Sequence, residues 1–233
     1  MLYYDFHIHS ALSPCGDNDM TPNNIVNMAM LLGLDAIAVS DHNSIGNAEA
    51  AMAVGKECGV AVIPGMEVET VEGVHILTLY PTLEQAEFAA KKVYEALPDI
   101  INRPEIFGEQ VYMDSDDNIT GYEEKLLISP ANISVNGLFD MVKSAEGLFI
   151  PAHVDRHSYS ILTNLGFIPD DLDIRNIEVS KAVDDLEIYL GNRPELKKYN
   201  IFRSSDAHYL ADIAERGARL EIEEIGELFG RYR

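Results

Sequence analysis

The sequence has little cysteine, no long apolar run and few basic residues. Its two cysteines, Cys15 and Cys58, lie far apart and form no evident disulfide framework, which is typical of a reducing compartment. No apolar run approaches the ~18 residues of a membrane span. Residues 1–7 lack the basic and apolar regions of a signal peptide. These absences predict a cytoplasmic protein without membrane contact.

The shortage of basic residues bears on possible partners. The chain has 17 Lys and Arg against 39 Asp and Glu, a formal net charge of −22. Binding along a nucleic acid draws on clustered Lys and Arg, so we do not expect long nucleic acids as partners. Some carboxylates could hold divalent cations, while most must form a solvated acidic surface.

What the sequence does contain is an alternation of β-prone apolar runs with amphipathic stretches, which predicts an α/β fold with a parallel sheet or barrel. A length of 233 residues suits one such barrel in a single domain. Expected strands are Leu2–Ile8, Asp35–Ser40, Val60–Met66, Val74–Tyr80, Leu148–Val154, Ile174–Ser180, Ile201–Ser205 and Ala218–Ile222. Expected helices are Pro22–Leu32, Asn47–Cys58, Leu83–Leu97, Val135–Ala145 and Asp184–Tyr199.

Residues 98–134 interrupt this alternation with turn-forming residues and only a short apolar run. We interpret them as an insertion that forms either a hairpin cap over the site or padding at the rim of the barrel.

Six of the seven histidines stand at an end of an apolar run or just beyond it. His7 and His9 end the first expected strand, and a spacing of two places both side chains on one face. His75 begins its run, so this strand need not point the same way as its neighbours. The candidate metal ligands placed in this way are His7, His9, His42, Glu67, His75, His153, Asp206 and His208.

Strand ends explain how residues so distant in sequence could meet. In a parallel barrel the carboxyl ends of the strands share one mouth, where catalytic residues gather. A single histidine at such a position is more often structural, but six together favour metal binding. Imidazole with carboxylate suits Zn²⁺, Fe or Mn²⁺, and a glutamate can bridge two ions. The sequence contains neither a Gly-rich phosphate loop nor a Gly-x-Ser-x-Gly elbow. Nucleotide binding of the P-loop or Rossmann kind and serine-hydrolase chemistry are therefore not favoured.

The residues around the candidate ligands form six short motifs, which are Asp5-Phe6-His7-Ile8-His9-Ser10, Ser40-Asp41-His42-Asn43-Ser44, Pro64-Gly65-Met66-Glu67, Val74-His75-Ile76-Leu77, Pro151-Ala152-His153 and Ser205-Asp206-Ala207-His208. In this ordered combination of motifs the chain resembles the PHP family, named for polymerase and histidinol phosphatase domains. Each motif is common by itself, whereas their order along nearly the whole chain, apart from residues 98–134, is specific.

The resemblance implies a distorted seven-stranded barrel, (β/α)7 and TIM-like, with two or three divalent ions. By similarity, His7, His9, Glu67 and Asp206 would hold the first ion, and Glu67, His75 and His153 the second. The third would take His42, His208 and a residue of the loop after the first strand. Cys15 stands where some relatives carry a histidine, and Asp17 is the alternative. A thiolate there would favour Zn²⁺ or Fe and be sensitive to oxidation.

Three residues are candidates for catalysis or substrate contact. Asp41 would orient His42 or transfer a proton near the third ion. Arg156 is placed to contact phosphate. His157 would donate a proton to the leaving alcohol, or else be a solvent-facing loop histidine.

The expected function is hydrolysis of a small phosphate ester, such as a nucleotide or a sugar or amino-alcohol phosphate, by metal-bound hydroxide. Three alternatives stay open: a catalytically silent metal-stabilised scaffold, an amidohydrolase that cleaves a carbon–nitrogen bond, and an exonuclease. The sequence does not predict the oligomeric state.

Overall fold

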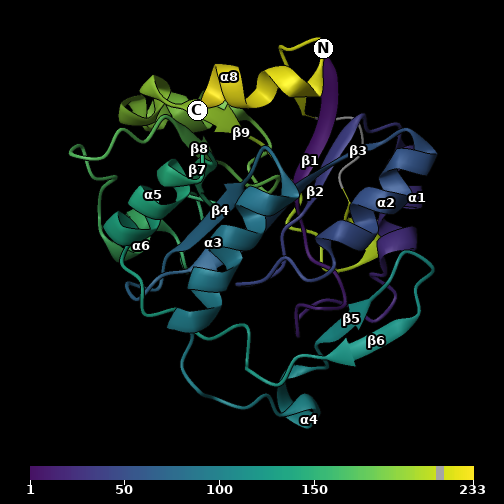
Figure 1. Cartoon of the computed structure of the whole chain (residues 1–233). Coiled ribbons are helices and arrows are strands. Elements are labelled where there is room, and N and C mark those ends of the chain that lie inside the picture. Colours follow the sequence, from purple (N-terminus) through teal and green to yellow (C-terminus); the bar gives the residue numbers. More distant parts are fainter. Residues whose placement is uncertain (214–217) are drawn as a thin grey trace.

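The computed structural model describes residues 1–213 and 218–233 (Figure 1). Six strands of the described chain form the main sheet, in the order β10-β1-β2-β3-β4-β7. Their bounds are β1 Leu2–Ile8, β2 Ala36–Val39, β3 Ala61–Glu69, β4 His75–Leu79, β7 Leu148–Pro151 and β10 Arg219–Leu220. A separate parallel pair joins β8 (Asn176–Glu178) to β9 (Asn200–Phe202).

The β8–β9 pair continues the curl of the main sheet back toward β1. On one side β8 lies beside β7, and the Val154 N–H beyond β7 donates to the Glu178 carbonyl. On the other side the chain after β9 returns to β1 through a parallel bridge between Ala207 and Ile8. The strands β1, β2, β3, β4, β7, β8 and β9 of the described chain therefore curl in chain order. The distorted seven-stranded α/β barrel is confirmed.

Within the main sheet, β4 runs against both of its neighbours, and β10 pairs antiparallel with β1. β4 pairs antiparallel with both β3 and β7, whereas β1, β2 and β3 are mutually parallel. The expectation that the His75 strand need not share its neighbours' direction is confirmed. The first residue of β4 therefore reaches the same end of the barrel as the last residues of the parallel strands.

Side-chain alternation separates the barrel interior from the helix-covered outside. Tyr4 and Phe6 of β1 join an interior cluster with Leu77, Ile150 and Phe202 from other strands. The pairing of β1 with β2 shifts register between Asp5 and Ile8, and beyond this irregularity Ile8 packs in the cluster that contains residues of α1 and α2.

Helices cover the outside of the sheet (Figure 1). Thr21 begins α1 by accepting a hydrogen bond from the Asn24 N–H, and Gly33, with φ 71°, ends it in the left-handed region that favours glycine. The helices are α1 Pro22–Leu32, α2 Ala48–Cys58, α3 Leu83–Ala96, α4 Pro104–Phe107, α5 Val135–Ser144, α6 Ile161–Asn164, α7 Leu186–Asn192 and α8 Leu228–Tyr232, with 3-10 turns at Pro194–Lys198, Leu210–Asp212 and Ile225–Glu227. No helix in the described ranges combines the length and apolar character needed to cross a membrane.

The expected helix Asp184–Tyr199 is wrong as one continuous element. It divides into α7 and the 3-10 turn Pro194–Lys198, and Arg193 between them has φ −133° and ψ 64°. Proline disfavours helical backbone in the residue before it and has no N–H to donate, so the helix ends there. The strands expected at 174–180, 201–205 and 218–222 are shorter in the structure than predicted.

The insertion, residues 98–134, contains α4 and a hairpin of β5 (Val111–Met113) and β6 (Ile119–Tyr122). Backbone hydrogen bonds tie the hairpin to the loop after β1, where the Val111 N–H donates to the Ala11 carbonyl at 2.9 Å. The Met113 N–H donates to the Asn47 side chain at 2.9 Å. The insertion thus packs on the loops that surround the mouth of the barrel.

Candidate metal centre

The predicted ligands come from six strands and the loops next to them. His7 lies in β1 and His9 directly after it, His75 begins β4, and Glu67 lies in β3. His42 follows β2 and is held next to Glu67 by an isolated parallel bridge. The remaining ligands stand in the loops after β7 and β9, and these are His153, Asp206 and His208. The curl of the sheet brings all of them to one end of the barrel.

Glu67 lies at the centre of this group and is 1% exposed. Its Oε1 lies 3.2 Å from His7 Nε2, 2.9 Å from His75 Nδ1 and 3.2 Å from His153 Nε2. Its Oε2 lies 3.5 Å from His9 Nε2 and 3.2 Å from His42 Nδ1. One carboxylate thus faces five imidazoles, divided between its two oxygens, which is the arrangement of a carboxylate able to bridge two cations.

Asp206 is the second carboxylate of the cluster. Its Oδ1 lies 3.1 Å from His9 Nε2 and 3.3 Å from His7 Nε2. The ligand atoms of His7, His9 and Asp206 all lie within 4.8 Å of one another, and so do those of His42, Glu67 and His75. Buried His, Glu and Asp side chains therefore form more than one group with the spacing of a metal site.

A further group of the same spacing contains Cys15. Its sulfur and the ring nitrogens of His9, His42 and His208 lie within 4.8 Å of one another. Asp17 has no atom in this group; its backbone N–H donates to the His208 carbonyl at 2.9 Å. Cys15 as a whole residue is exposed. Burial of its thiol, followed by the charges of Glu67 and Asp41, nevertheless raises the pKa of Cys15 to about 12.

Several ring nitrogens in the cluster have close neighbours but no hydrogen bond. Within the described ranges, buried nitrogens without a hydrogen-bond partner include His7 Nε2, His42 Nδ1 and His153 Nδ1. Buried polar atoms are rarely left unpaired in proteins. Two of these nitrogens, His7 Nε2 and His42 Nδ1, each lie 3.2 Å from an oxygen of Glu67. This distance is similar to the separation of two ligand atoms bound to one cation. The donor set and its geometry therefore fit divalent ions.

The charges of the cluster act strongly on one another. Burial alone would lower the pKa of His7, but Glu178 and Glu67 raise it well above the ordinary value. Burial likewise opposes the ionised Asp206, yet His7 and His9 hold its pKa well below the usual range. Burial, followed by the charge of His9, lowers the pKa of His42 well below its ordinary value. In a metal-free cluster these groups share protons, and bound cations would take the place of those protons.

The backbone at the mouth of the barrel is strained at several of these positions. His153 has φ 31° and Asp206 has φ 55°, and Asn43, next to His42, has φ 52°. Residues other than glycine rarely adopt positive φ, and such residues cluster at functional sites. The fold thus holds two predicted ligands in backbone conformations that L-residues disfavour.

The three predicted catalytic residues lie in different surroundings. Arg156 lines a cavity of about 310 Å³ together with the ligands, and its Nη1 donates to Asp206 Oδ2 at 2.5 Å. His157 is exposed and lies outside the lining of this cavity. Asp41 is 1% exposed and also lies outside the lining; it accepts hydrogen bonds from Ser10 and Ser13. Only Arg156 of the three reaches the cavity.

Sequence reasoning missed two residues that support the cluster. Glu178, 1% exposed, accepts from His7 Nδ1 at 3.0 Å and from the His153 N–H at 3.0 Å. The sequence does offer a signal for Glu178, because it is a charged residue between Ile177 and Val179 in an otherwise apolar strand. Tyr159 stacks on the His75 ring with centroids 4.4 Å apart, and an exposed loop tyrosine gives no such signal.

Comparison with known proteins identifies the family. The PHP domain family model matches residues 5–168, which is most of the chain and includes seven of the nine predicted ligands, Cys15 among them. The chain therefore belongs to the PHP domain family.

One curated relative and two solved structures show the range of similar proteins. A 5'-3' exoribonuclease of Haemophilus influenzae is 34% identical over 79 residues, 33% of this chain and 28% of that protein. A lesion-specific endonuclease from Pyrococcus furiosus has a TM-score of 0.66 at 21% identity over 90% of this chain and 49% of its own. A protein from Bifidobacterium adolescentis, assigned as a metal-dependent phosphoesterase, has a TM-score of 0.58 at 19% identity over 88% of this chain and 87% of its own.

The matches cover only part of two of these proteins. This chain spans less than a third of the exoribonuclease and about half of the endonuclease chain. The two structural likenesses, both under 25% identical, concern the fold.

Proposed function

We propose that this chain hydrolyses a small phosphate ester, either a phosphomonoester or a small phosphodiester, at a centre of two or three divalent ions. The observation that carries the proposal is the Glu67 carboxylate with five imidazoles around its two oxygens and Asp206 beside it. Membership of the PHP domain family supports the same conclusion.

We assign the ligands to three positions. In this proposal His7, His9, Glu67 and Asp206 hold one ion, Glu67, His75 and His153 hold a second, and Cys15, His42 and His208 hold a third. A thiolate ligand at the third position favours Zn²⁺ or Fe over Mn²⁺. When bound, such ions supply charge neutralisation at phosphoryl oxygens and lower the pKa of nearby water.

Arg156 is the residue of this chain proposed to bind the phosphoryl group. It is the one Lys or Arg among the described residues that line the cavity. It is half-exposed, with 41% of its side chain accessible, and it donates to the outer oxygen of Asp206. A guanidinium in this position can contact a phosphoryl oxygen while Asp206 keeps its other oxygen toward the histidines.

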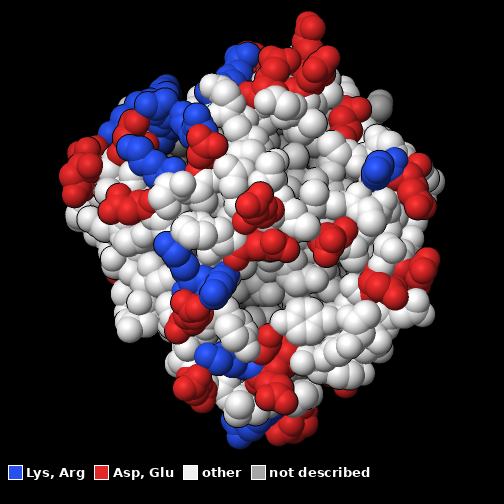
Figure 2. Space-filling view, in the orientation of Figure 1, with Lys and Arg blue, Asp and Glu red and all other residues white. Residues whose placement is uncertain are grey.

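The size of the cavity supports a small substrate. Its volume of about 310 Å³ lies at the lower end of the range for small-molecule sites. Ile128 from the insertion and Tyr159 form apolar parts of its wall. In the view of Figure 2, acidic side chains are spread over the face shown and basic ones lie mainly along its left side, so a continuous basic tract does not cross the described part of the face in view.

A second candidate function is the removal of nucleotides from the ends of short RNAs. The similarity to the exoribonuclease favours this candidate. Both candidates use the same phosphoester chemistry and differ in what surrounds the phosphate. A substrate panel separates them, with p-nitrophenyl phosphate, mononucleotides, sugar phosphates, histidinol phosphate and 5'-phosphorylated RNA of increasing length. A rate that rises with RNA length supports the second candidate.

The test of the proposed function begins with the metal content of the purified protein. We expect two or three ions per chain and turnover of at least one small ester that ceases with chelator and returns with added metal. Full metal without turnover of any ester would favour a scaffold, and turnover of amide or other carbon–nitrogen substrates would favour an amidohydrolase. A chain that binds no divalent ion would overturn the proposal.

A further inference from the structure

We propose that Asp41 and Ser13 are positioning residues that fix the proton of His9 on Nδ1 and so present His9 Nε2 to a metal ion. This inference rests on the proposed metal centre and assigns a role to a carboxylate that does not reach the cavity.

The first step is the hydrogen bonding of Asp41. Three donors point at its two oxygens: the Ser10 N–H at 2.7 Å, the Ser10 hydroxyl at 2.6 Å and the Ser13 hydroxyl at 2.6 Å. The Ser10 hydroxyl also accepts from the Asn47 amide at 3.0 Å and from the Leu12 N–H at 3.2 Å. Its one proton is therefore directed to Asp41, and the carboxylate acts as an acceptor.

The second step assigns the donors and acceptors around the Ser13 hydroxyl in the same way. Its hydroxyl accepts from the His42 N–H at 3.1 Å and directs its one proton to Asp41. His9 Nδ1 lies 3.0 Å from the same oxygen. Since the hydroxyl proton is already used, Ser13 can only accept from His9, so His9 Nδ1 carries a proton.

The third step is the consequence for the other ring nitrogen. In the neutral imidazole that binds a metal, a proton on Nδ1 leaves the lone pair of His9 on Nε2, the atom that faces Asp206 at 3.1 Å and Glu67 at 3.5 Å. His7 has the same arrangement, but Glu178 accepts directly from its Nδ1 at 3.0 Å. Outer partners of this kind fix the tautomer of metal-binding histidines. The two histidines at the end of β1 therefore use different partners for one purpose, a carboxylate for His7 and a carboxylate acting through a serine for His9.

Further backbone hydrogen bonds hold the loop that carries Cys15. The Gly16 N–H donates to the Ser13 carbonyl at 2.8 Å, and the Asp17 N–H donates to the His208 carbonyl at 2.9 Å. A Cβ at residue 16 would collide with the Ser10 carbonyl oxygen, so this close turn requires glycine. Asp41 thus anchors a loop that touches the other residues grouped with His9.

The experiment compares two variants with two matched controls. Ser13→Ala removes the hydroxyl between Asp41 and His9 but leaves the Ser10–Asp41 bonds; Asp41→Asn alters both. Ser115→Ala and Asp116→Asn make the same chemical changes at exposed positions of the insertion. Zinc affinity is measured by competition with a chelator, and the protonated nitrogen of His9 is read by ¹⁵N NMR of the zinc-loaded protein. Circular dichroism and thermal unfolding check the fold.

We expect the parent chain to show His9 protonated on Nδ1 and zinc bound at Nε2. Ser13→Ala and Asp41→Asn should weaken zinc binding by about 10–100-fold, the usual cost of an outer-shell partner, and the His9 Nδ1–H signal should broaden or be lost. The His7 signal and both controls should not change.

Two results would overturn the inference. One is a Ser13→Ala variant that binds zinc as tightly as the parent and shows an unchanged His9 signal. This result would exclude the positioning of His9 by Asp41 through Ser13 and would leave the proposed function intact. A parent chain that binds no zinc or other divalent ion would overturn both. If Asp41→Asn does not fold, Ser13→Ala alone decides, because it keeps the Ser10–Asp41 hydrogen bonds.

Discussion

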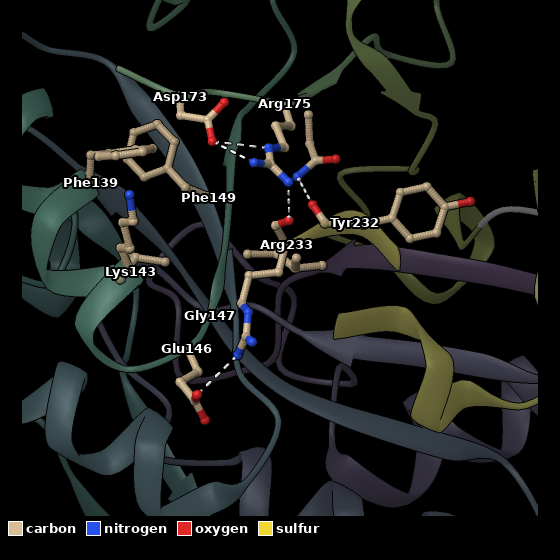
Figure 3. Close-up of a pocket in the computed structure, with 12 residues that line it drawn as sticks. Phe139, Lys143, Glu146, Gly147, Phe149, Asp173, Arg175, Tyr232 and Arg233 are labelled. Atoms are coloured by element: carbon tan, nitrogen blue, oxygen red, sulfur yellow. Dashed lines mark hydrogen bonds and ion pairs between the residues drawn. The ribbon is translucent and has the colours of Figure 1, made fainter. Parts of the chain in front are cut away.

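Two cavities of similar size lie at opposite ends of β7. The cavity among the histidines, about 310 Å³, lies beyond the carboxyl end of the strand. The other, about 350 Å³, is lined by Gly147 and Leu148 at its start, by α5 and by the last residues of the chain (Figure 3). Both contain charged side chains near apolar ones, so neither size nor charge distinguishes them.

The pairing of their polar atoms does distinguish them. In the cavity of Figure 3, Arg175 donates to Asp173 at 2.7 Å and to the Arg233 carbonyl at 2.8 Å, and Arg233 pairs with Glu146 at 3.1 Å. Lys143 lies 5.7 Å from the centre of the Phe139 ring. In the histidine cavity, by contrast, ring nitrogens are buried without hydrogen bonds. Paired charges join parts of the chain to one another, whereas converging unpaired donors indicate a place for a ligand.

The largest expected effect is that of Glu67→Gln. The amide keeps the size of the side chain but loses the negative charge that faces five imidazoles. We expect at least two ions to bind more weakly, by more than the about 100-fold that an outer partner costs, and hydrolysis to fall to background. Metal analysis after dialysis measures it. Wild-type metal content in this variant would contradict a bridging role.

Arg156→Ala should reduce activity without removing metal. Loss of one donor to a developing oxyanion typically costs about 100- to 1,000-fold, and we expect kcat/KM to fall within that range. The control is His157→Ala, the neighbouring exposed residue. If His157 is the proton donor of the sequence prediction, this variant too should lower kcat; if it is a surface residue, kcat should be unchanged. An Arg156→Ala enzyme with full activity would exclude Arg156 as the phosphate contact.

Cys15→Ser tests the third position alone. We expect the bound metal to fall by one ion per chain and the preference for zinc over manganese to weaken, since oxygen is a harder ligand than sulfur. Cobalt-loaded parent protein should show a near-ultraviolet sulfur-to-metal band that the variant lacks. Cys58→Ser, in the other free cysteine, is the matched control. Retention of three ions at full occupancy in Cys15→Ser would exclude the thiol as a necessary ligand.

The smallest effect is expected in the second cavity. Lys143→Ala changes an exposed side chain and should alter the free energy of unfolding by about 0.5 kcal/mol or less. Metal content and hydrolysis should stay at the parent level. Thermal unfolding and the same activity assay measure this. A marked loss of activity would show that the two cavities are coupled through β7 and would remove the distinction drawn between them.

Much of the barrel and of the ligand group could be predicted because each depends on local pattern. Strands show as apolar runs, and histidines at their ends lie together once the sheet curls. The break at Pro194 was also readable, since proline within a helical stretch is a local signal.

What could not be predicted depends on the path of loops and on partners distant in sequence. Asp41 meets Ser10, 31 residues away, only because the loop after β1 folds back on the chain after β2. Glu178 meets His7 across 171 residues, and the sequence around it resembles that of any strand with one charged residue. Such pairs depend on tertiary geometry, which a single sequence does not give.

The reversed direction of β4 has a consequence for how the centre assembles during folding. Because β3 and β4 form a hairpin, Glu67 and His75 meet across only eight residues of chain, whereas His9 and Asp206 meet across 197. The entropy lost in closing a loop grows with its length, so the first of these pairs can form well before the second. We therefore expect the central carboxylate and one imidazole to belong to a local unit that forms before the barrel closes, and the residues after β9 to complete the centre last.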